Sequence, residues 1–437
     1  MLSLRLSLNK DVYKHCVKVY ISKQEKASMQ KKNALNVIWL GLVSLLTDVS
    51  SEMLFPIIPL FLTIILKANM AVVGFIEGVA EGTAAILKFI SGILSDRFKN
   101  KKILTIIGYS SSAIVKPFLA LATLWQHVLI VRVLDRIGKG IRTSPRDALI
   151  AASVKDSERG KYFGLHRTMD SIGAVIGVLL VTALLFYLGE SEASFRIVFW
   201  LSLIPAVLAV LLLFFFVRDV EAPKREIKKQ NPFNLFKVWK KLNKQLKTFY
   251  LIMLLFNAAS FSYAFFILRA QNVGFAIKLI PILYLVYNIF YAFSAYPAGK
   301  ISDHFGRNRV LCAGFLLFAI TSLGFGFFAN DSTLWLLFAM YGVFIGLTDG
   351  VARAVVADLS TEKDAGTAFG VYHMIVGLTI FPTNVTGGLL WKYINPTAPF
   401  VYAAVLALCA AGAILLFHNR EKVKNVKMRI QDFKAYR

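Results

Sequence analysis

The sequence predicts an all-α membrane protein made of two similar halves, and three observations point to this fold. Hydrophobic residues make up 57% of the chain and the mean hydropathy is +0.61, whereas a soluble domain is about 45–50% apolar. Apolar stretches of roughly 20 residues, the length that crosses a bilayer as a helix, recur along the chain. A polar signature also occurs twice, about half the chain apart, which is typical of transporters built from repeats.

Twelve membrane-spanning helices are expected from these apolar stretches. The expected spans lie at 35–66, 71–95, 103–124, 127–150, 162–188, 195–217, 248–269, 275–298, 309–329, 334–357, 367–391 and 397–417. The first span is long for a single crossing, so we expect it to tilt or to project beyond the bilayer.

Basic residues predict the orientation of the chain. Residues 1–32 hold eight Lys and Arg, 218–247 hold ten and 418–437 hold seven, which is half of the 50 in the chain. The loops expected on the other side hold only Lys67 and Lys392. Because basic loops stay in the cytoplasm, we expect both termini and the central loop there, with the chain in the inner (plasma) membrane. The net charge of +25 therefore reflects topology, and no nucleic-acid partner is expected.

The predicted organisation has five parts. A six-helix bundle at 35–217 and a second at 248–417 are joined by a basic cytoplasmic loop at 218–247. Basic cytoplasmic tails flank them at 1–34 and 418–437. The central loop contains a stretch that reads equally well as an amphipathic helix on the inner leaflet or as a solvated linker.

The duplicated signature is Gly92-Ile-Leu-Ser-Asp96-Arg97, which returns as Gly299-Lys-Ile-Ser-Asp303-His304. Its glycine and aspartate are both displaced by 207 residues. A second landmark, Gly160-Lys-Tyr-Phe163-Gly164, returns as Gly366-Thr-Ala-Phe369-Gly370 at a displacement of 206. Two landmarks at nearly the same displacement indicate a duplication of the whole half.

This pattern resembles the major facilitator superfamily, in its bacterial-type twelve-helix form, over essentially all of residues 33–417. The resemblance implies two pseudo-symmetric six-helix bundles and transport by alternating access. In that family the signature joins helices 2 and 3, and a weaker copy joins helices 8 and 9. One departure is Lys99, which stands where the family usually has the glycine that the second copy keeps as Gly306.

The resemblance also implies an inner gate. Asp96 would accept hydrogen bonds at the start of helix 11, near Gly366, and clamp the halves together on the inside. The basic residues of the motif serve equally well as signals of topology. The predicted gate residues are Gly92, Asp96, Arg97, Lys101, Gly299, Asp303, Gly306 and Arg307.

Ionisable residues are concentrated in the expected spans of the first half. A charge inside the membrane costs several kcal/mol, so each is expected to face a cavity or a partner. Two carboxylates one helical turn apart share a face, and close carboxylates in a low dielectric cannot both ionise cheaply. That arrangement suits proton loading and release, although buried salt bridges that fix helix register are an open alternative. The predicted coupling residues are Asp48, Glu52, Glu77, Glu81, Arg132 and Asp135.

Arg132-Val-Leu-Asp135-Arg136 resembles the helix 4 motif of the family, whose arginine is associated with proton transfer. A row of arginines can bind carboxylate or phosphate groups, which indicates an anionic or zwitterionic cargo. In a competing interpretation the arginines pair with the acids of helices 1 and 2 and leave no net charge. The residues predicted to line the cargo cavity are Arg136, Lys139, Arg142, Asn257, Asn288, Asp349 and Arg353.

Helix 5 carries Gly164, Gly173 and Gly177, a spacing similar to the antiporter signature of drug-efflux members. Val178 stands where that signature has proline. The same spacing is also typical of close helix packing, so both interpretations stay open.

These observations predict a secondary transporter and not an enzyme. The chain has no phosphate-binding loop and no metal-binding motif, so we expect no cofactor, no metal and no ATP-driven pump. We expect proton-coupled movement of a small organic solute, with organic acids or siderophore-type hydroxycarboxylates as examples. The alternative is a drug/H⁺ antiporter for cationic or lipophilic compounds. Sodium stays open as the coupling ion, and the expected state is a monomer in the bilayer.

Overall fold

The computed structural model describes residues 35–97, 100–154, 159–220, 239, 242–360 and 365–435, and it describes side chains for 35–87, 100–154, 162–220, 239, 242–360 and 368–418. Helices joined by short turns account for these residues, and none of them lies in a strand. The prediction of an all-α protein is therefore confirmed.

The first half of the chain begins with a helix over 35–52, which passes through a turn into two short segments. Pro56 and Pro59 explain the break, because proline lacks an N–H and clashes with the preceding helical turn. The segments that follow are α2 (Ile58–Leu60), the π-helix η1 (Phe61–Ile65), α3 (Met70–Arg97), α4 (Lys101–Val115), the 3-10 helix η2 (Lys116–Leu121), α5 (Trp125–Ser153), α6 (Arg159–Leu188), α7 (Glu192–Leu201) and α8 (Leu203–Phe216).

The second half repeats this succession of long helices. Its described elements are α10 (Lys244–Asn257), α11 (Tyr263–Asn272), the 3-10 helix η4 (Ile277–Leu279), α12 (Ile280–Phe305), α13 (Arg307–Phe327), α14 (Thr333–Leu359), α15 (Ala365–Tyr393) and α16 (Ala398–Ala435). The side chain of Asn243 caps α10 by accepting from Leu246 N–H, and Ser262 caps α11 by accepting from Ala264 N–H.

Nine helices within the described residues are long and apolar enough to cross a membrane. The three expected spans outside this set differ for separate reasons. The span at 35–66 is interrupted after residue 52, and the span at 248–269 is interrupted between Asn257 and Tyr263. The span at 127–150 lies in one continuous helix, α5, which is rich in charged residues. The total of twelve crossings stays a prediction.

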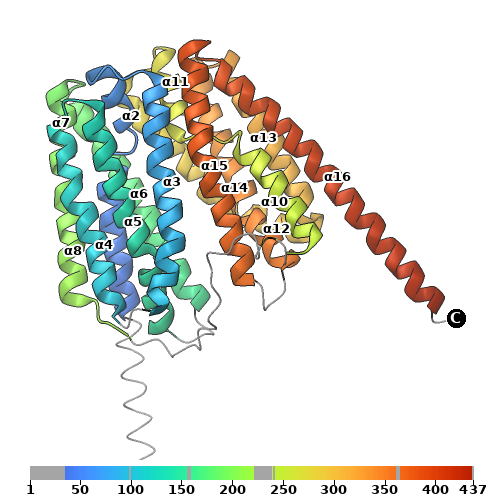
Figure 1. The fold of residues 1–437 in the computed structure, drawn as a ribbon. Helices are drawn as coiled ribbons and strands as arrows, with labels where there is room; N and C mark the ends of the chain where they lie inside the picture. Colours follow the sequence, from blue (N-terminus) through green and yellow to red (C-terminus); the bar gives the residue numbers. More distant parts are fainter. Residues whose placement is uncertain are drawn as a thin grey trace, which may run out of the picture.

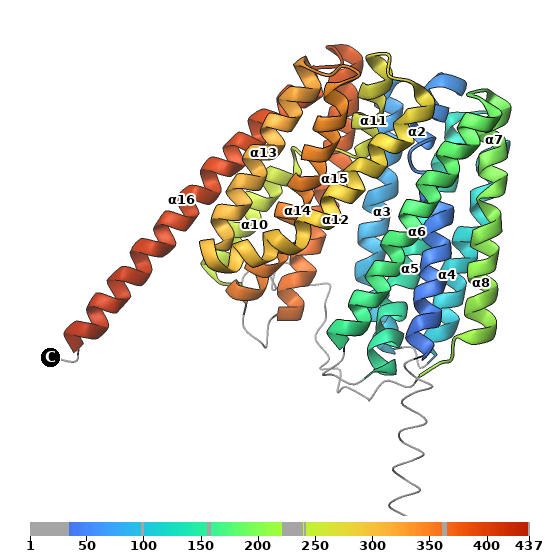
Figure 2. The same ribbon diagram turned by 180° about the vertical axis from the view of Figure 1, so that it is seen from behind.

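The helices stand side by side in two groups, with α3 to α8 in one and α10 to α16 in the other (Figure 1). The view from behind shows the same grouping (Figure 2). Between the groups, α3 packs along α15, and α6 packs against α12. Much of the central loop lies outside the described residues, as does the whole of the predicted N-terminal tail, so the five-part division stays a prediction.

Glycines bring α3 and α15 into backbone contact. A Cβ atom on Gly74 would lie 2.2 Å from the carbonyl oxygen of Asn384, and one on Gly388 would lie 2.4 Å from the carbonyl oxygen of Met70. Side chains larger than hydrogen cannot occupy these positions without movement of the backbone. The contact fixes how the two halves meet around the buried charges of α3.

Candidate coupling and cargo site

A buried ion pair joins α3 to α5. Arg132 Nη2 lies 2.7 Å from Glu77 Oε1, and the two side chains are only 2% and 1% exposed. The other carboxylate oxygen, Oε2, accepts a hydrogen bond of 2.9 Å from Ser262 Oγ of the second half. The backbone N–H of Ser262 in turn donates to Asn384 Oδ1 at 2.8 Å. Glu77 therefore connects an arginine of its own half to the break between α10 and α11.

A second ion pair lies one helical turn along the same two helices. Arg136 Nη2 lies 2.9 Å from Glu81 Oε1, with the arginine buried and the glutamate partly exposed. The ring of Phe55 lies over both guanidinium groups, with its centre 5.5 Å from Arg132 Cζ and 4.9 Å from Arg136 Cζ. Arg132 and Arg136 therefore pair with acids of α3, the second predicted helix. This is the pairing expected if the arginines neutralise the acids instead of binding cargo.

Asp135 belongs to a separate polar network. It accepts a short hydrogen bond from Ser112 Oγ of α4, and Lys116 is foremost among the cations that face it. The ammonium group of Lys116 donates to Ser50 Oγ at 3.0 Å and to Ser51 Oγ at 2.9 Å. These buried contacts join the helix over 35–52 to α4 and α5, and they give Asp135 partners within the first half.

Asp48 and Glu52 lie one turn apart near the end of the helix over 35–52. The charges that face Asp48 are those of Lys139, Arg142, Arg146 and Asp170. Glu52 is hydrogen-bonded to Tyr284 of α12, whereas its Oε2 atom is buried with no hydrogen-bond partner among the described residues. Glu52, like Glu77, therefore reaches from the first half to the second.

Two further cations of α5 lie beside aromatic rings. Arg142 is buried, its Cζ lies 4.3 Å from the centre of the Tyr109 ring, and its Nη1 has no hydrogen-bond partner in the described part of the chain. Lys139 Nζ lies 6.0 Å from the Phe55 ring. Arg142 is thus a buried cation with unused hydrogen-bonding capacity close to Asp48.

The predicted cargo residues of the second half make contacts within their own helices. The side-chain amides of Asn257 and Asn288 donate to carbonyl oxygens of their own helices, Met253 at 2.7 Å and Tyr284 at 2.9 Å. Asp349 and Arg353 form an ion pair of 2.6 Å with each other. Their roles in cargo binding stay predictions.

The comparisons with known proteins decide the family. A model described as Major Facilitator Superfamily matches residues 40–284 and 250–435. The chain belongs to the major facilitator superfamily. It is 39% identical over 412 residues to an uncharacterised MFS-type transporter of Methanocaldococcus jannaschii, covering 91% of this chain and 100% of that one. It is also 34% identical to a puromycin resistance protein of Streptomyces alboniger, over 132 residues that make up 30% of this chain and 26% of the other.

Solved structures of the same fold support this assignment. A mutant form of the nucleoside transporter NupG superposes with a TM-score of 0.76 at 15% identity, covering 87% of this chain and 99% of that one. A bacterial homologue of the human lysosomal transporter Spinster, in an inward-facing and unoccupied conformation, gives 0.72 at 16% identity, covering 88% and 97%. The chain is therefore a multi-pass membrane transporter of this superfamily.

The second copy of the superfamily signature is fully described. Gly306 has a φ of +92° and separates α12 from α13, a conformation that glycine adopts readily. Arg307 Nη2 lies 3.7 Å from Asp303 Oδ1, and Arg307 Nε lies 2.7 Å from Asp358 Oδ2 of α14. Gly299 lies on α12, and a Cβ atom there would have no neighbour within 4 Å among the described residues. Asp358, which is not among the predicted gate residues, is the closer partner of Arg307.

The first copy is described only in part. Its backbone continues α3 to Arg97, and α4 begins at Lys101 after the cap of Asn100. The side chains of Asp96 and Arg97 lie outside the described set, as do those around Gly366 and the whole of Lys99. Gly92 also lies in the part of α3 for which only the backbone is described. The predicted inner gate between helix 2 and helix 11 therefore stays a prediction.

The glycines of α6 serve close packing at two of their three positions. A Cβ on Gly173 would lie 2.3 Å from the carbonyl oxygen of Leu45, and one on Gly177 would lie 2.5 Å from that of Val49. The Cβ position of Gly164 faces open space as far as the described residues extend. Gly173 and Gly177 therefore allow α6 to lie directly against the helix over 35–52, which is the packing interpretation of this spacing.

Proposed function

We propose that this transporter is proton-coupled and carries a small organic anion or zwitterion by alternating access between bundles at 35–217 and 248–417. The observation that carries the proposal is the position of Glu77. It is a titratable group, it is buried, and it holds Arg132 of its own half and Ser262 of the opposite half at the same time. Protonation of its carboxylate removes the charge that both partners use. A proton would therefore weaken the contact between the halves.

Glu52 provides a second titratable contact of the same kind. Its bond to Tyr284 also joins the halves, and its Oε2 atom has no hydrogen-bond partner among the residues described. Asp48 lies one turn away and faces the cations of α5. Coupling in this proposal involves Asp48, Glu52, Glu77 and Arg132, whereas the Glu81 pair with Arg136 and the Asp135 network hold α5 in place.

A cargo with a carboxylate or phosphate group suits the cations of α5. Arg132, Arg136 and Arg142 each have a buried guanidinium nitrogen without a hydrogen-bond partner in the described structure, and an anionic group can satisfy such donors in a bidentate manner. The Asp48 carboxylate interacts with Arg142 and with two further cations of α5, so a zwitterion with an additional amine also suits the site. Organic acids and hydroxycarboxylates belong to the first class.

Two contacts link the halves at the end of the molecule that carries the short loops. Thr63 Oγ1 of η1 lies 3.2 Å from Gln271 Oε1 of α11 and 3.1 Å from the carbonyl oxygen of Pro59, so its one proton is shared between these acceptors, and Lys278 N–H donates to Glu190 Oε1 at 2.9 Å. We propose that this end is the outer one, with the termini in the cytoplasm and the chain in the plasma membrane. Under that orientation the described contacts close the outer end of the transport path.

Drug/H⁺ antiport is the second candidate. Aromatic side chains lie close to the coupling acids, since Tyr263 contacts Phe55 and Tyr284 at ring distances of 6.1 Å and 5.2 Å. Rings of this kind bind lipophilic cations. Partial similarity to the puromycin resistance protein supports the same idea.

Flux into proteoliposomes tests the two candidates. Purified protein is reconstituted, a pH gradient or a sodium gradient is imposed, and the movement of radiolabelled citrate, radiolabelled glutamate and ethidium is followed. We expect gradient-dependent movement of an organic anion or amino acid that is lost in Glu77→Gln. Movement of ethidium alone would favour the antiporter, and movement driven by sodium but not by protons would overturn proton coupling.

A further inference from the structure

Two titratable side chains of α6, His166 and Asp170, are not among the coupling or cargo residues proposed above. They lie one helical turn apart, with His166 Nδ1 3.6 Å from Asp170 Oδ2, and both are buried. His166 Nε2 and Asp170 Oδ1 have no hydrogen-bond partner within the described residues. A buried polar group without a partner has a cost in stability, so two of them on one turn of a helix require an explanation.

Close packing brings this turn against the helix that carries the coupling acids. Gly173 and Gly177 of α6 place it in backbone contact with Leu45 and Val49, which are neighbours of Asp48. Asp170 lies one turn before Gly173, and its charge faces that of Asp48. The glycine spacing of α6 therefore has a direct consequence, because it holds the histidine and aspartate beside the acids of the first helix.

The four groups are linked one to the next. His166 Nδ1 lies 3.6 Å from Asp170 Oδ2, the charge of Asp170 acts on Asp48, and the charge of Asp48 acts on Glu52 one helical turn further along. Within the described residues no three His, Cys, Asp or Glu side chains lie close enough together to hold a metal ion. A line of single titratable groups is suited to passing a proton from one to the next, whereas a cation site needs several ligands at one point.

This series of titratable groups also has a direction across the membrane. His166 is seven residues from the first residue of α6, Arg159, at the predicted cytoplasmic end, which is roughly 10 Å at 1.5 Å per residue. Glu52 ends the helix over 35–52, roughly 25 Å from its start at the same rise. The groups thus extend from near one surface to the middle of the bundle.

We propose that His166 and Asp170 carry protons between the predicted cytoplasmic side and the carboxylates of Asp48 and Glu52. This inference rests on the proposed function, since it supplies the path that proton coupling needs. His166 accepts a proton at Nε2 and releases its other proton from Nδ1 to Asp170, and Asp170 passes it through water to Asp48. The imidazole returns to its first tautomer by exchanging its remaining proton with water, so one proton moves inward for each one taken up.

Basic groups on the adjoining helices surround this path. His166 faces Arg146, Asp147 and Arg167 in addition to Asp170, and Asp48 faces Lys139, Arg142 and Arg146. Glu52 faces Lys139, Arg136 and the hydroxyl of Tyr284. These cations stabilise the ionised carboxylates, so that each added proton makes the local charge more positive.

The first experiment does not depend on the cargo. Full-length protein with ¹⁵N-labelled histidine is placed in nanodiscs, and the His166 signal is assigned by its loss in His166→Gln. We expect the titration midpoint of His166 to move by at least about 0.5 pH unit in Asp170→Asn and by a smaller amount in Asp48→Asn, because Asp170 is in contact with His166 and its charge acts on Asp48 in turn. His127, which is exposed on α5, is the internal reference and should not move. A His166 signal that is indifferent to both substitutions would overturn the path.

The second experiment separates proton movement from cargo movement. In proteoliposomes with the probe that the wild type moves, we expect His166→Gln to reduce pH-gradient-driven accumulation at least about tenfold, while exchange of labelled for unlabelled probe stays within about twofold. His127→Gln is the matched control and should retain both. Equal loss of exchange and accumulation would make the pair structural and overturn the inference. If the wild type moves no probe under a pH gradient, the proposed function fails, whereas the histidine titration still decides whether the four groups interact.

Discussion

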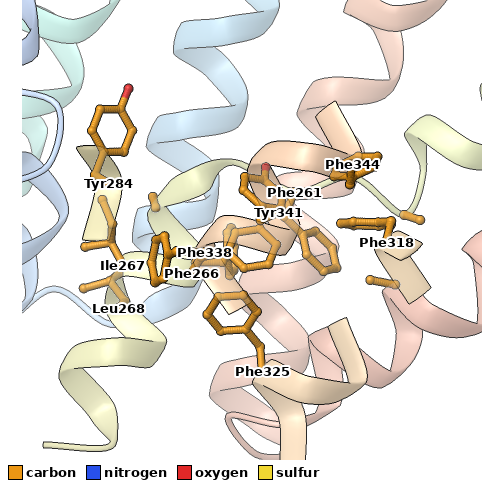
Figure 3. Packing of buried hydrophobic residues seen from close by; sticks show 14 of the residues in the cluster. Phe261, Phe266, Ile267, Leu268, Tyr284, Phe318, Phe325, Phe338, Tyr341 and Phe344 are labelled. Carbon is orange, nitrogen blue, oxygen red and sulfur yellow. The ribbon is translucent and has the colours of Figure 1, made fainter. Parts of the chain in front are cut away.

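In the first half of the chain the buried interior contains Glu77, Lys116, Arg132 and Asp135, whereas the interior of the second half is a packed set of aromatic rings. Figure 3 shows these rings, with Phe266, Phe325 and Tyr341 close to one another. The centres of the Phe266 and Tyr341 rings are 4.3 Å apart. Apolar rings pack in one well-defined arrangement, but ion pairs change with protonation. We therefore propose that protonation changes contacts in the first half, and that the packed second half is a rigid surface against which the first half moves.

The largest effect should come from breaking the buried ion pair of the charged interior, whose glutamate also contacts the second half. Arg132→Ala leaves the Glu77 carboxylate buried without its cation, which should lower the free energy of unfolding by about 3–5 kcal/mol and abolish pH-driven transport. Reversible unfolding in mixed micelles and proteoliposome flux measure the two effects.

The second half offers a matched control for this prediction. Arg353→Ala removes an ion pair whose members are 46% and 44% exposed, so it should cost at most about 1 kcal/mol. Equal costs at the two sites would show that the halves do not differ in how they hold charge.

Removing a ring from the aromatic interior should affect stability without changing coupling. Phe266 is fully buried against Phe325 and Phe400 as well as Tyr341, so Phe266→Ala should cost about 3 kcal/mol or more. The number of protons moved per cargo molecule should stay the same, as measured by flux at several pH gradients.

Phe293→Ala is the control for the ring substitution, because Phe293 is 78% exposed and should contribute little to stability. A changed proton-to-cargo ratio in Phe266→Ala would contradict the proposal that the second half is only a rigid surface.

Sequence reasoning could reach the fold because its evidence is periodic and repeated. The all-α prediction followed from the apolar stretches, and the family followed from the signature with its 207-residue displacement. Pro56 and Pro59 even contained the information for the break after residue 52, although one long span was predicted there. The break before Ser262 has no such signal, since it depends on contacts of Ser262 with Glu77 and Asn384 that are distant in the sequence.

The types of residue that form the site could be predicted from the sequence, but which of these residues pair with one another could not. Glu77 and Arg132 could be identified as intramembrane charges, whereas their contact depends on how α3 and α5 pack. The sequence left open whether Arg136 binds cargo or an acid, and the structure pairs it with Glu81. Asn257 and Asn288 were predicted from polarity alone, and a polar side chain can equally bond its own helix, as both do here.

A smaller effect is expected at the contact between α3 and α15, where the charged first half meets the aromatic second half. Gly74→Ala would place a methyl group 2.2 Å from the Asn384 carbonyl oxygen, so the helices must separate, at a cost of about 1–3 kcal/mol. We expect a lower midpoint of thermal unfolding and slower exchange of cargo.

Gly299→Ala is the matched control for this substitution, because its Cβ position has no neighbouring atom within 4 Å among the described residues and alanine favours the helix. If Gly74→Ala were as stable as Gly299→Ala, the close contact would not be what holds the halves in register.

The smallest effect concerns the hydrogen bond between Thr63 and Gln271. A single neutral bond contributes about 0.5–1.5 kcal/mol, so Thr63→Val should shift the balance between closed and open outer ends by about threefold to tenfold without unfolding the protein. Spin labels on cysteines that replace Lys67 and Lys392, in a background without other cysteines, report the distance between the halves at this end. Thr83→Val is the control, since the Thr83 hydroxyl donates to the Val79 carbonyl of its own helix. We expect a longer-distance population to grow only in Thr63→Val. An unchanged distribution would mean that the charged half, through Glu52 and Glu77, holds the outer end closed without help from this bond.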